Sequence, residues 1–324
     1  MPWQDEGAES TVARIDQKAF SGLARRPRRR TTGAALLLLA PYLTLLLVFG
    51  IGPVVYAVYT AFTRVDLLTS EQSFSASANW SEVATDPRLG EATANVGRYL
   101  ALWLPSLLLL VVTIALLAQH RRGRFSAAVR FACYVPGAIS GSAAALVWLF
   151  MVTPEYSPFG PGLRALGFDS SSETITSGSL PVVLSVIATA VTAGGWIVVL
   201  YAALNALPAE LMEAAAIDGA SPLQTALQIK LPLIKNYLAL MLISSFAYGT
   251  QLFVEPQVMR AAFTGQISET WSVNQLAYFF ATQEGDFGKA AALSLLLMLV
   301  GVLLAVAVMR RTDFYATDAT KDRR

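Results

Sequence analysis

The residues that could do chemistry are few, and their types argue against catalysis in this chain. Among 324 residues there is one His, His120, and one Cys, Cys133. Hydrolysis within a membrane would use a Ser–His pair, an Asp pair or a metal set such as H-E-x-x-H. The segment GDFGKA (285–290) has a Gly-Lys pair but lacks the first Gly and the following Ser or Thr of a phosphate-binding loop. We therefore expect no catalytic residue, metal site or ATPase site here, and we interpret Cys133 as a packing residue.

Contact with another protein is a different kind of chemistry, and the segment EAAAIDGASPLQTALQIKLPLIKN, from Glu213 to Asn236, is suited to it. Residues 208–217 are good helix formers, and Pro208 is acceptable at the first helical position. Asp218-Gly219 should stop this helix, because Gly can adopt a left-handed cap. Three alanines, Ala214 to Ala216, keep the helix thin enough for a partner surface to approach closely.

The same segment predicts a second short helix. Ser221 as N-cap, Pro222 at the first position and Gln224 as capping-box partner would begin it. We expect it to end near Leu231, with Pro232 at the entry to the next apolar run. The insert, 204–235, is thus predicted as helix, tight turn, helix. A surface helix lying on lipid headgroups is the alternative, but the acidic Glu213 and Asp218 disfavour it because lipid anchoring prefers Lys or Arg.

The elements that position this insert are membrane spans. The chain is 55% hydrophobic and only 14% charged, where a soluble domain carries about a quarter charged residues. A span needs about 20 mostly apolar residues. Six windows qualify: 34–62, 96–119, 129–152, 180–203, 236–256 and 290–309. The first contains Pro41 and Pro53 and should tilt or kink. The fourth, with its Ser, Thr and Gly residues, should face protein or a water-filled path.

Basic residues set the orientation of these spans. With six spans, the two termini and the loops near 120–128 and 204–235 share one side, which holds 18 of the 24 Lys and Arg. The positive-inside rule places that side in the cytoplasm. We divide the chain into a basic cytoplasmic tail (1–33), a six-span domain (34–310) and a cytoplasmic C-terminal tail (311–324). The N-terminal tail is either an amphipathic surface helix or a disordered segment that fixes topology.

The insert resembles the EAA loop of ABC-importer permeases, in which EAA is followed by three residues, Gly, nine residues and I-x-L-P. Three other segments resemble the carbohydrate-uptake branch, of the maltose and glycerol-3-phosphate permease type: APYLTLLLVFGIGPVVYAVYTAF, VPGAISGSAAALVWLFM and FGKAAALSLLLMLVGVLL. Ala226 and Asn236 depart from the family, which often has Phe and Pro there. The matching positions of the loop are Glu213, Ala214, Ala215, Gly219, Ile229, Leu231 and Pro232.

The resemblance implies an all-α, type I ABC-importer fold in the cytoplasmic membrane of a bacterium. It implies that the first short helix, about 208–219, is a coupling helix that docks on a cytoplasmic ATPase subunit. Glu213, Ala214, Ala215, Asp218 and Gly219 would form this contact. The implied partners are a second homologous permease, two ATPase subunits that bind ATP and Mg, an external solute-binding lipoprotein, membrane lipid and a sugar-like solute. This chain would bind no cofactor and no nucleic acid.

The family places solute contacts on the spans that flank the coupling insert. On the fourth span Thr189, Thr192 and Trp196 share one helical face, and the fifth offers Ser245, Tyr248 and Gln251, the last two at i, i+3. Hydrogen bonds between helices are the alternative role for such small polar residues. A disaccharide or oligosaccharide is the expected solute, with glycerol-3-phosphate or a glycerophosphodiester as alternatives.

An ion-coupled secondary transporter is the rival transport mechanism. It would need ionisable groups or unwound helices near the membrane centre. No Asp, Glu, Lys or His lies near a predicted span centre. Glu255, Arg98 and His120 fall near span ends, and we interpret them as membrane-interface residues. The sequence therefore favours a transport subunit whose energy comes from another polypeptide.

Overall fold

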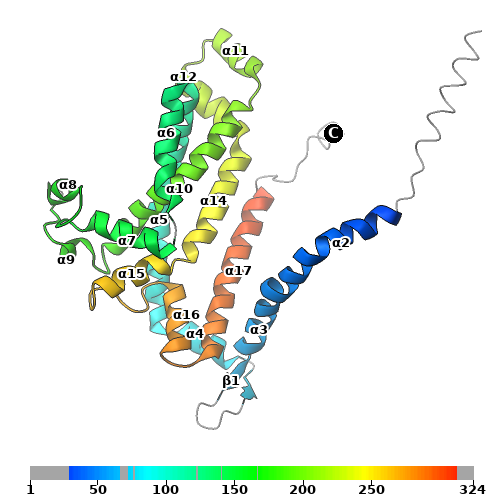
Figure 1. Cartoon of the computed structure of the whole chain (residues 1–324), viewed down its shortest axis with the longest axis vertical. Helices are drawn as coiled ribbons and strands as arrows, with labels where there is room; N and C mark the ends of the chain where they lie inside the picture. Colours follow the sequence, from blue (N-terminus) through cyan, green and yellow to red (C-terminus); the bar gives the residue numbers. More distant parts are fainter. Residues whose placement is uncertain are drawn as a thin grey trace, which may run out of the picture. The chain divides into compact units, whose positions relative to one another are not determined.

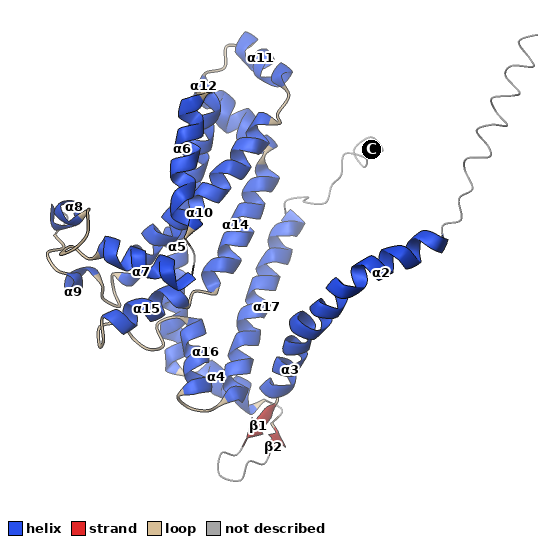
Figure 2. Cartoon of the chain, in the orientation of Figure 1, coloured by secondary structure: helices blue, strands red, loops and turns tan. Residues whose placement is uncertain are grey.

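The computed structural model describes residues 29–65, 72–75, 77–121, 123–139, 141–165 and 167–311, and over these ranges the chain is almost entirely helical (Figures 1 and 2). The chain divides into two compact units, 1–56 and 57–324. The predicted tails 1–33 and 311–324 fall almost wholly outside the described residues. Their boundaries and the amphipathic helix stay predictions.

The first span begins in the first unit with α2 (Arg29–Leu45) and the π-helical η1 (Leu46–Ile51), and it ends with α3 (Gly52–Ala61). Pro41 lies inside α2, and Pro53 lies just after η1. Because proline lacks an N–H, a locally widened turn accommodates the missing bond. The stretch Leu37–Ala61 is long and apolar enough to cross a membrane.

The second unit holds the remaining elements. They are, in chain order, β1 (Thr63–Val65), β2 (Gln72–Phe74), α4 (Ala78–Thr85), α5 (Pro87–His120), α6 (Arg124–Tyr134), η2 (Val135–Ala138), α7 (Gly141–Val152), α8 (Gly160–Ala165), α9 (Ser171–Thr174), α10 (Leu180–Asn205), α11 (Ala209–Ile217), α12 (Pro222–Gln224), η3 (Thr225–Lys230), α13 (Leu231–Leu233), α14 (Lys235–Thr250), α15 (Val254–Ala262), α16 (Val273–Thr282) and α17 (Phe287–Arg311). The two strands pair antiparallel, with Thr63 opposite Phe74.

Of the predicted spans, four are continuous helices in the described residues: Leu37–Ala61, α5, α10 and α17. The other two are bent pairs. Arg124–Ala138 and Gly141–Val152 meet at 109°, and Pro222–Leu233 meets α14 at 70°. The count of six spans therefore holds if each bent pair is one span. The spans expected over 129–152 and 236–256 correspond to these two bent pairs, and the bends were not anticipated.

Proline and glycine explain where these spans break. Pro136 lies in η2, and Gly141 has a φ of +64°, which a regular helix does not allow. The fifth span ends at Thr250 instead of 256. The chain restarts as α15, and Pro256 lies in the first turn of that helix, where its missing N–H needs no partner.

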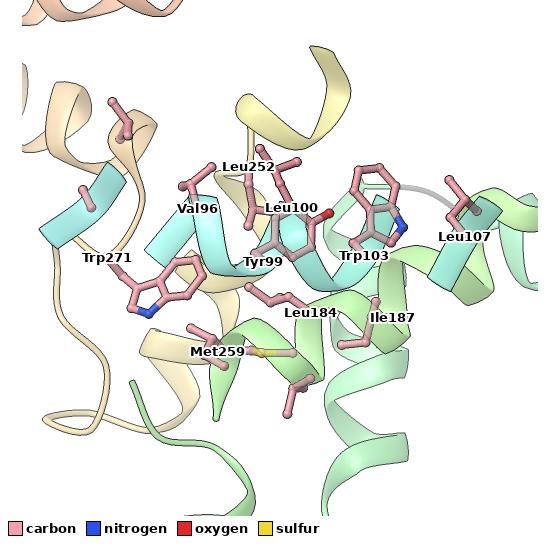
Figure 3. Close-up of a cluster of buried hydrophobic side chains, with 14 of the residues drawn as sticks. Val96, Tyr99, Leu100, Trp103, Leu107, Leu184, Ile187, Leu252, Met259 and Trp271 are labelled. Atoms are coloured by element: carbon pink, nitrogen blue, oxygen red, sulfur yellow. The ribbon is translucent and has the colours of Figure 1, made fainter. Parts of the chain in front are cut away.

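The core of the second unit is the packing of α5 on α10. Tyr99, Trp103 and Leu107 of α5 lie against Leu184 and Ile187 of α10, and each of these side chains is nearly or fully buried (Figure 3). Of the candidate spans, Leu180–Asn205 has the largest buried share, 44% of its apolar window. The expectation that the fourth span faces protein is therefore confirmed.

A network of charges closes the end of this unit that carries α4 and α16. Arg88 bonds Asp86, with an Nη2–Oδ2 distance of 2.6 Å, and Glu284, with an Nη2–Oε1 distance of 2.8 Å. Lys289 lies 3.0 Å from the same Glu284 and 3.3 Å from Asp286. The network joins the start of α5 to the turn that enters α17. It fixes the end opposite α11 (Figure 1).

Candidate coupling loop and solute cavity

The short helix predicted near 208–219 is present as α11, at the end of the unit where α6 begins and α10 stops (Figure 1), and its coupling role stays a prediction. Pro208 is the N-cap of α11, whereas the sequence predicted it at the first helical position, so the helix begins one residue later than expected. It ends as predicted, because Asp218 is the C-cap and Gly219 has a φ of +78°. The Gly219 and Ala220 N–H groups donate to Ala216 O and Ala215 O, at 3.1 and 3.0 Å. These bonds satisfy carbonyls that a helix end leaves free.

The face that α11 shows to its surroundings is small and acidic. Glu213, Ala214, Asp218 and Gly219 are exposed, whereas Ala215 is only 5% exposed and faces its own chain. Four of the five residues predicted for the contact are therefore accessible, and Ala215 holds the helix in place. Sequence reasoning missed Ile217, which is 86% exposed. The signal for it is a large aliphatic residue directly before an Asp-Gly stop.

The second short helix starts as predicted but ends later. Ser221 Oγ accepts from the Gln224 N–H, and Gln224 Oε1 accepts from the Ser221 N–H, so the capping box is present. The helix then widens into the π-helical η3 and continues through Pro232 to Leu233. The break falls at Ile234, which has non-helical backbone angles. Proline has no N–H to donate, which suits a widened turn just before it.

The predicted solute residues do not form one site. Thr192 and Tyr248 line a small cavity of about 60 Å³ that is bounded by α5, α7, α10, α14 and α15. Gln251 lies past the end of α14 and lines a separate depression against α17, so it does not share a helical face with Tyr248. The i, i+3 pairing of those two residues was therefore wrong, because the helix ends between them.

The other three candidates, Thr189, Trp196 and Ser245, are not among the residues that line this cavity. Thr189 Oγ1 donates to Ser185 O at 2.7 Å and lies 3.2 Å from Ser106 Oγ of α5, as expected for a hydrogen bond between helices. Trp196 packs at the edge of the core. Ser245 is 3% exposed, and its Oγ has no hydrogen-bond partner among the described residues.

Sequence reasoning missed the aromatic wall of the cavity. The rings of Tyr99 and Trp103 stack at 5.3 Å, and the Tyr248 ring lies 6.1 Å from that of Trp103. Tyr99 lines the cavity, and neither its hydroxyl nor Trp103 Nε1 has a partner among the described residues. The available signal was the i, i+4 spacing of two aromatic residues in the second span. Buried polar atoms of this kind normally have a partner.

Glu255 is the charged group among the residues that line the cavity, and its carboxylate lies next to the Tyr248 phenol. The interpretation of Glu255 as a membrane-interface residue missed this position. Among the described residues, His, Cys, Asp and Glu form no group of three that could hold a metal ion. The arrangement can offer hydrogen bonds and aromatic faces to a small polar molecule.

Comparison with known proteins identifies the family. Residues 99–313 match the family model described as the binding-protein-dependent transport system inner membrane component. A sulfoquinovosyl glycerol transport system permease protein of Agrobacterium fabrum is 26% identical over 93% of this chain and 97% of its own length. An arabinooligosaccharides transport system permease protein of Halalkalibacterium halodurans is 28% identical over 88% of this chain and 87% of its own length.

Two further matches have the same extent. An sn-glycerol-3-phosphate transport system permease protein of Salmonella typhi is 26% identical over 89% of this chain and 97% of its length. A solved bacterial ABC transporter for the import of alginate contains a chain of the same fold, with a TM-score of 0.70, 18% identity, and coverage of 90% of this chain and 98% of that one. The exposed short helix between spans, the apolar helices and the family match agree: this chain belongs to the binding-protein-dependent transport system inner membrane components and is the permease subunit of such a system.

Proposed function

We propose that this chain is one of two permease subunits of an ATP-driven importer that moves a sugar or sugar-like solute into the cytoplasm. Permease proteins for sulfoquinovosyl glycerol, arabinooligosaccharides and sn-glycerol-3-phosphate are its full-length relatives. The observation that carries the proposal is α11, a short helix with an accessible acidic face that a left-handed glycine ends.

An ATPase subunit is the partner that we assign to α11. The face formed by Glu213, Ala214 and Asp218 is narrow, so a groove can enclose it, and its charge suits a basic groove wall. The exposed Ile217 adds an apolar anchor. ATP and Mg would bind on that partner. Both termini and this loop would lie in the cytoplasm, as the distribution of Lys and Arg requires.

A second permease and an external solute-binding lipoprotein would complete the assembly. A solved alginate transporter in complex with a periplasmic protein that binds alginate pentasaccharide has a chain of this fold. The cavity of about 60 Å³ is small for a ligand site, so the solute path would widen in another state or extend into the partner permease.

The cavity favours a neutral hydroxylated solute over a phosphorylated one. Its lining combines aromatic faces, Thr192, the Glu255 carboxylate and the Tyr99 hydroxyl, which has no hydrogen-bond partner in the part of the chain that the structure describes. Among the described residues, no Lys or Arg, which would pair with a phosphate, lines this cavity. Glycerol-3-phosphate is therefore the less favoured of the two solute classes.

The coupling role is tested in the reconstituted importer with both permeases, the ATPase and the binding protein. The double change Glu213→Lys, Gly219→Pro should abolish the stimulation of ATP hydrolysis by the binding protein. The single change Glu91→Lys, at an exposed site on α5, is the matched charge reversal and should leave stimulation at the wild-type level. Unchanged stimulation in the double variant would refute the coupling role. Binding of neutral oligosaccharides and of glycerol-3-phosphate to the binding protein tests the solute class separately.

A further inference from the structure

Gln119, one residue before the end of α5, contacts both ends of the coupling insert. Its Nε2 donates to Leu204 O at 2.7 Å, and its Oε1 accepts from Lys230 Nζ at 2.8 Å. Leu204 is the penultimate residue of α10, just before α11, and Lys230 is the last residue of η3, after α11. One side chain therefore connects the entry and the exit of the insert to a third helix.

The chemistry of the site calls for glutamine. The last four carbonyls of a helix have no partner within the helix, and Leu204 is 1% exposed, so its carbonyl needs a donor from elsewhere. Lys230 carries only donors and needs an acceptor. An amide offers one donor group and one acceptor, and a single orientation satisfies both contacts. Glu would present an oxygen to the Leu204 carbonyl, and Met would serve neither contact.

The helix ends around Gln119 form one block. Ser126 Oγ of α6 donates to Ala118 O of α5 at 2.8 Å. The Arg130 guanidinium of α6 lies 3.8 Å from the centre of the Tyr201 ring of α10. A cation so close to an aromatic face is attracted to it. The ends of α5, α6 and α10 are thus fixed to one another, and Gln119 attaches the insert to that block.

The same two helices carry the cavity. Tyr99 of α5 is 20 residues from Gln119, which is about 30 Å along a helix at 1.5 Å per residue. Thr192 of α10 lies on the other wall. The buried contact between α5 and α10 makes them a stiff pair, so a displacement at their ends reaches the cavity.

We propose that Gln119 is a positioning residue that transmits displacement of the coupling helix α11 to α5 and α10. This proposal rests on the proposed function, because it needs an ATPase to move α11. Without the Gln119 contacts, the insert would move with the ATPase while α5 and α10 lag behind. The importer would then hydrolyse ATP with a reduced change at the cavity.

The experiment follows the cavity directly and requires no knowledge of the solute. The complete importer is reconstituted in proteoliposomes with its ATPase sites facing the bath, in a Cys133→Ala background that carries Ala188→Cys in the cavity lining. The rate of labelling by a membrane-impermeant maleimide in the bath is measured with and without MgATP and orthovanadate. In the parent protein, MgATP with vanadate should lower this rate as the cavity closes to the ATPase side.

For Gln119→Met, we expect this decrease in labelling rate to shrink at least about five-fold, because the variant loses two hydrogen bonds, one of them from a charged donor. ATP hydrolysis without vanadate should persist. Lys230→Met should act in the same direction, and Lys230→Arg, which keeps a charged donor, should restore the decrease. Asn205→Ala is the matched control. Asn205 Nδ2 donates to Tyr201 O at 2.7 Å, within α10, so the loss of this bond should leave the decrease in labelling rate unchanged.

The proposal is overturned if the decrease in labelling rate is as large in both Gln119→Met and Lys230→Met as in the parent protein. It is also overturned if Asn205→Ala reduces this decrease as much as Gln119→Met does. If Gln119→Met does not co-purify with the ATPase, Lys230→Met alone decides. If the proposed function is wrong, the decrease in labelling rate should also remain in the double variant Glu213→Lys, Gly219→Pro. This result distinguishes the failure of the proposed function from the failure of the Gln119 proposal.

Discussion

Arg88 at the N-terminal end of α5 provides a quantitative test of the structure. Its side chain bonds Asp86 and Glu284 and lies 5.1 and 5.2 Å from the ring centres of Phe279 and Phe280. The side chains of Arg88, Asp86 and Glu284 are 33%, 13% and 28% exposed. An exposed ion pair contributes up to about 1 kcal/mol, and breaking a buried pair costs about 3–5 kcal/mol. With this intermediate exposure, Arg88→Met should lower the free energy of unfolding by about 2 kcal/mol.

The pKa values of the carboxyl groups in this network predict how the free energy of unfolding changes with pH. The Arg88 side-chain hydrogen bond holds the pKa of Asp86 below its ordinary value of 3.8. Burial raises the pKa of Glu284, but hydrogen bonds from Arg88 and Lys289 lower it more, and the net pKa lies below 4.5. Depressed carboxyl pKa values stabilise the fold above the ordinary values, and this stability is lost as pH falls through the folded-state values. The parent protein should therefore lose more stability between about pH 5 and pH 3 than Arg88→Met does.

Thermal unfolding in detergent, followed by intrinsic Trp fluorescence at pH 7, 5 and 4, measures both effects. Arg98→Met is the matched control, because Arg98 is an exposed arginine on the same helix whose Nη1 is 3.4 Å from Asn95 Oδ1. It should cost at most about 0.5 kcal/mol. Equal losses in the two variants at pH 7, or equal pH slopes in Arg88→Met and the parent, would show that the charge network around Arg88 does not stabilise the fold.

Three further changes test other parts of the structure. Gly288→Ala would place its Cβ 2.5 Å from Asn79 Nδ2 and 2.8 Å from Thr63 O, so it should lower the unfolding temperature by several degrees, about 1–3 kcal/mol, and a parental temperature would contradict this packing. Ser245→Ala removes a buried hydroxyl that has no partner among the described residues, so stability should stay equal or rise slightly, and a loss above about 1 kcal/mol would reveal a missing partner. Glu255→Gln removes the charge from the cavity lining and should change the KM for uptake about ten-fold while binding-protein-stimulated ATP hydrolysis persists; unaltered uptake kinetics would place the solute path elsewhere.

The local structure of the coupling loop was predictable because it depends on backbone chemistry. Gly219 adopts the left-handed conformation that its place after Asp218 indicates, and Ser221 with Gln224 forms the expected capping box. These signals act within four residues, so no distant contact can overrule them easily. The membrane spans were likewise visible as apolar runs, since their length is set by the bilayer.

The residues that line the cavity could not be predicted without the tertiary structure. Helical spacing grouped Tyr248 with Gln251, but the helix ends between them, and no local signal showed that end because Pro256 lies five residues further on. Tyr99 and Glu255 meet at the cavity from segments far apart in the sequence, so their proximity depends on packing of five helices. The role of Gln119 was also hidden, because a Gln near a span end has many ordinary functions.

The arrangement of straight and bent spans indicates where the permease can change shape. α5 and α10 are continuous and share a buried core, so separating them would expose Trp103, Leu107 and Ile187 at about 1.5–3 kcal/mol for each side chain. The opposite walls of the cavity come from α7, α14 and α15. These helices lie next to the bend between Arg124–Ala138 and Gly141–Val152, to the bend at Ile234 and to the helix end at 251–253. Backbone angles at such breaks can change without breaking a continuous helix. We therefore expect the cavity to open by movement of the bent spans against a stiff α5–α10 pair. Cross-linking α5 to α10 by engineered cysteines should then leave transport intact, whereas cross-linking α7 to α10 should stop it; transport that stops in the first variant would refute this division.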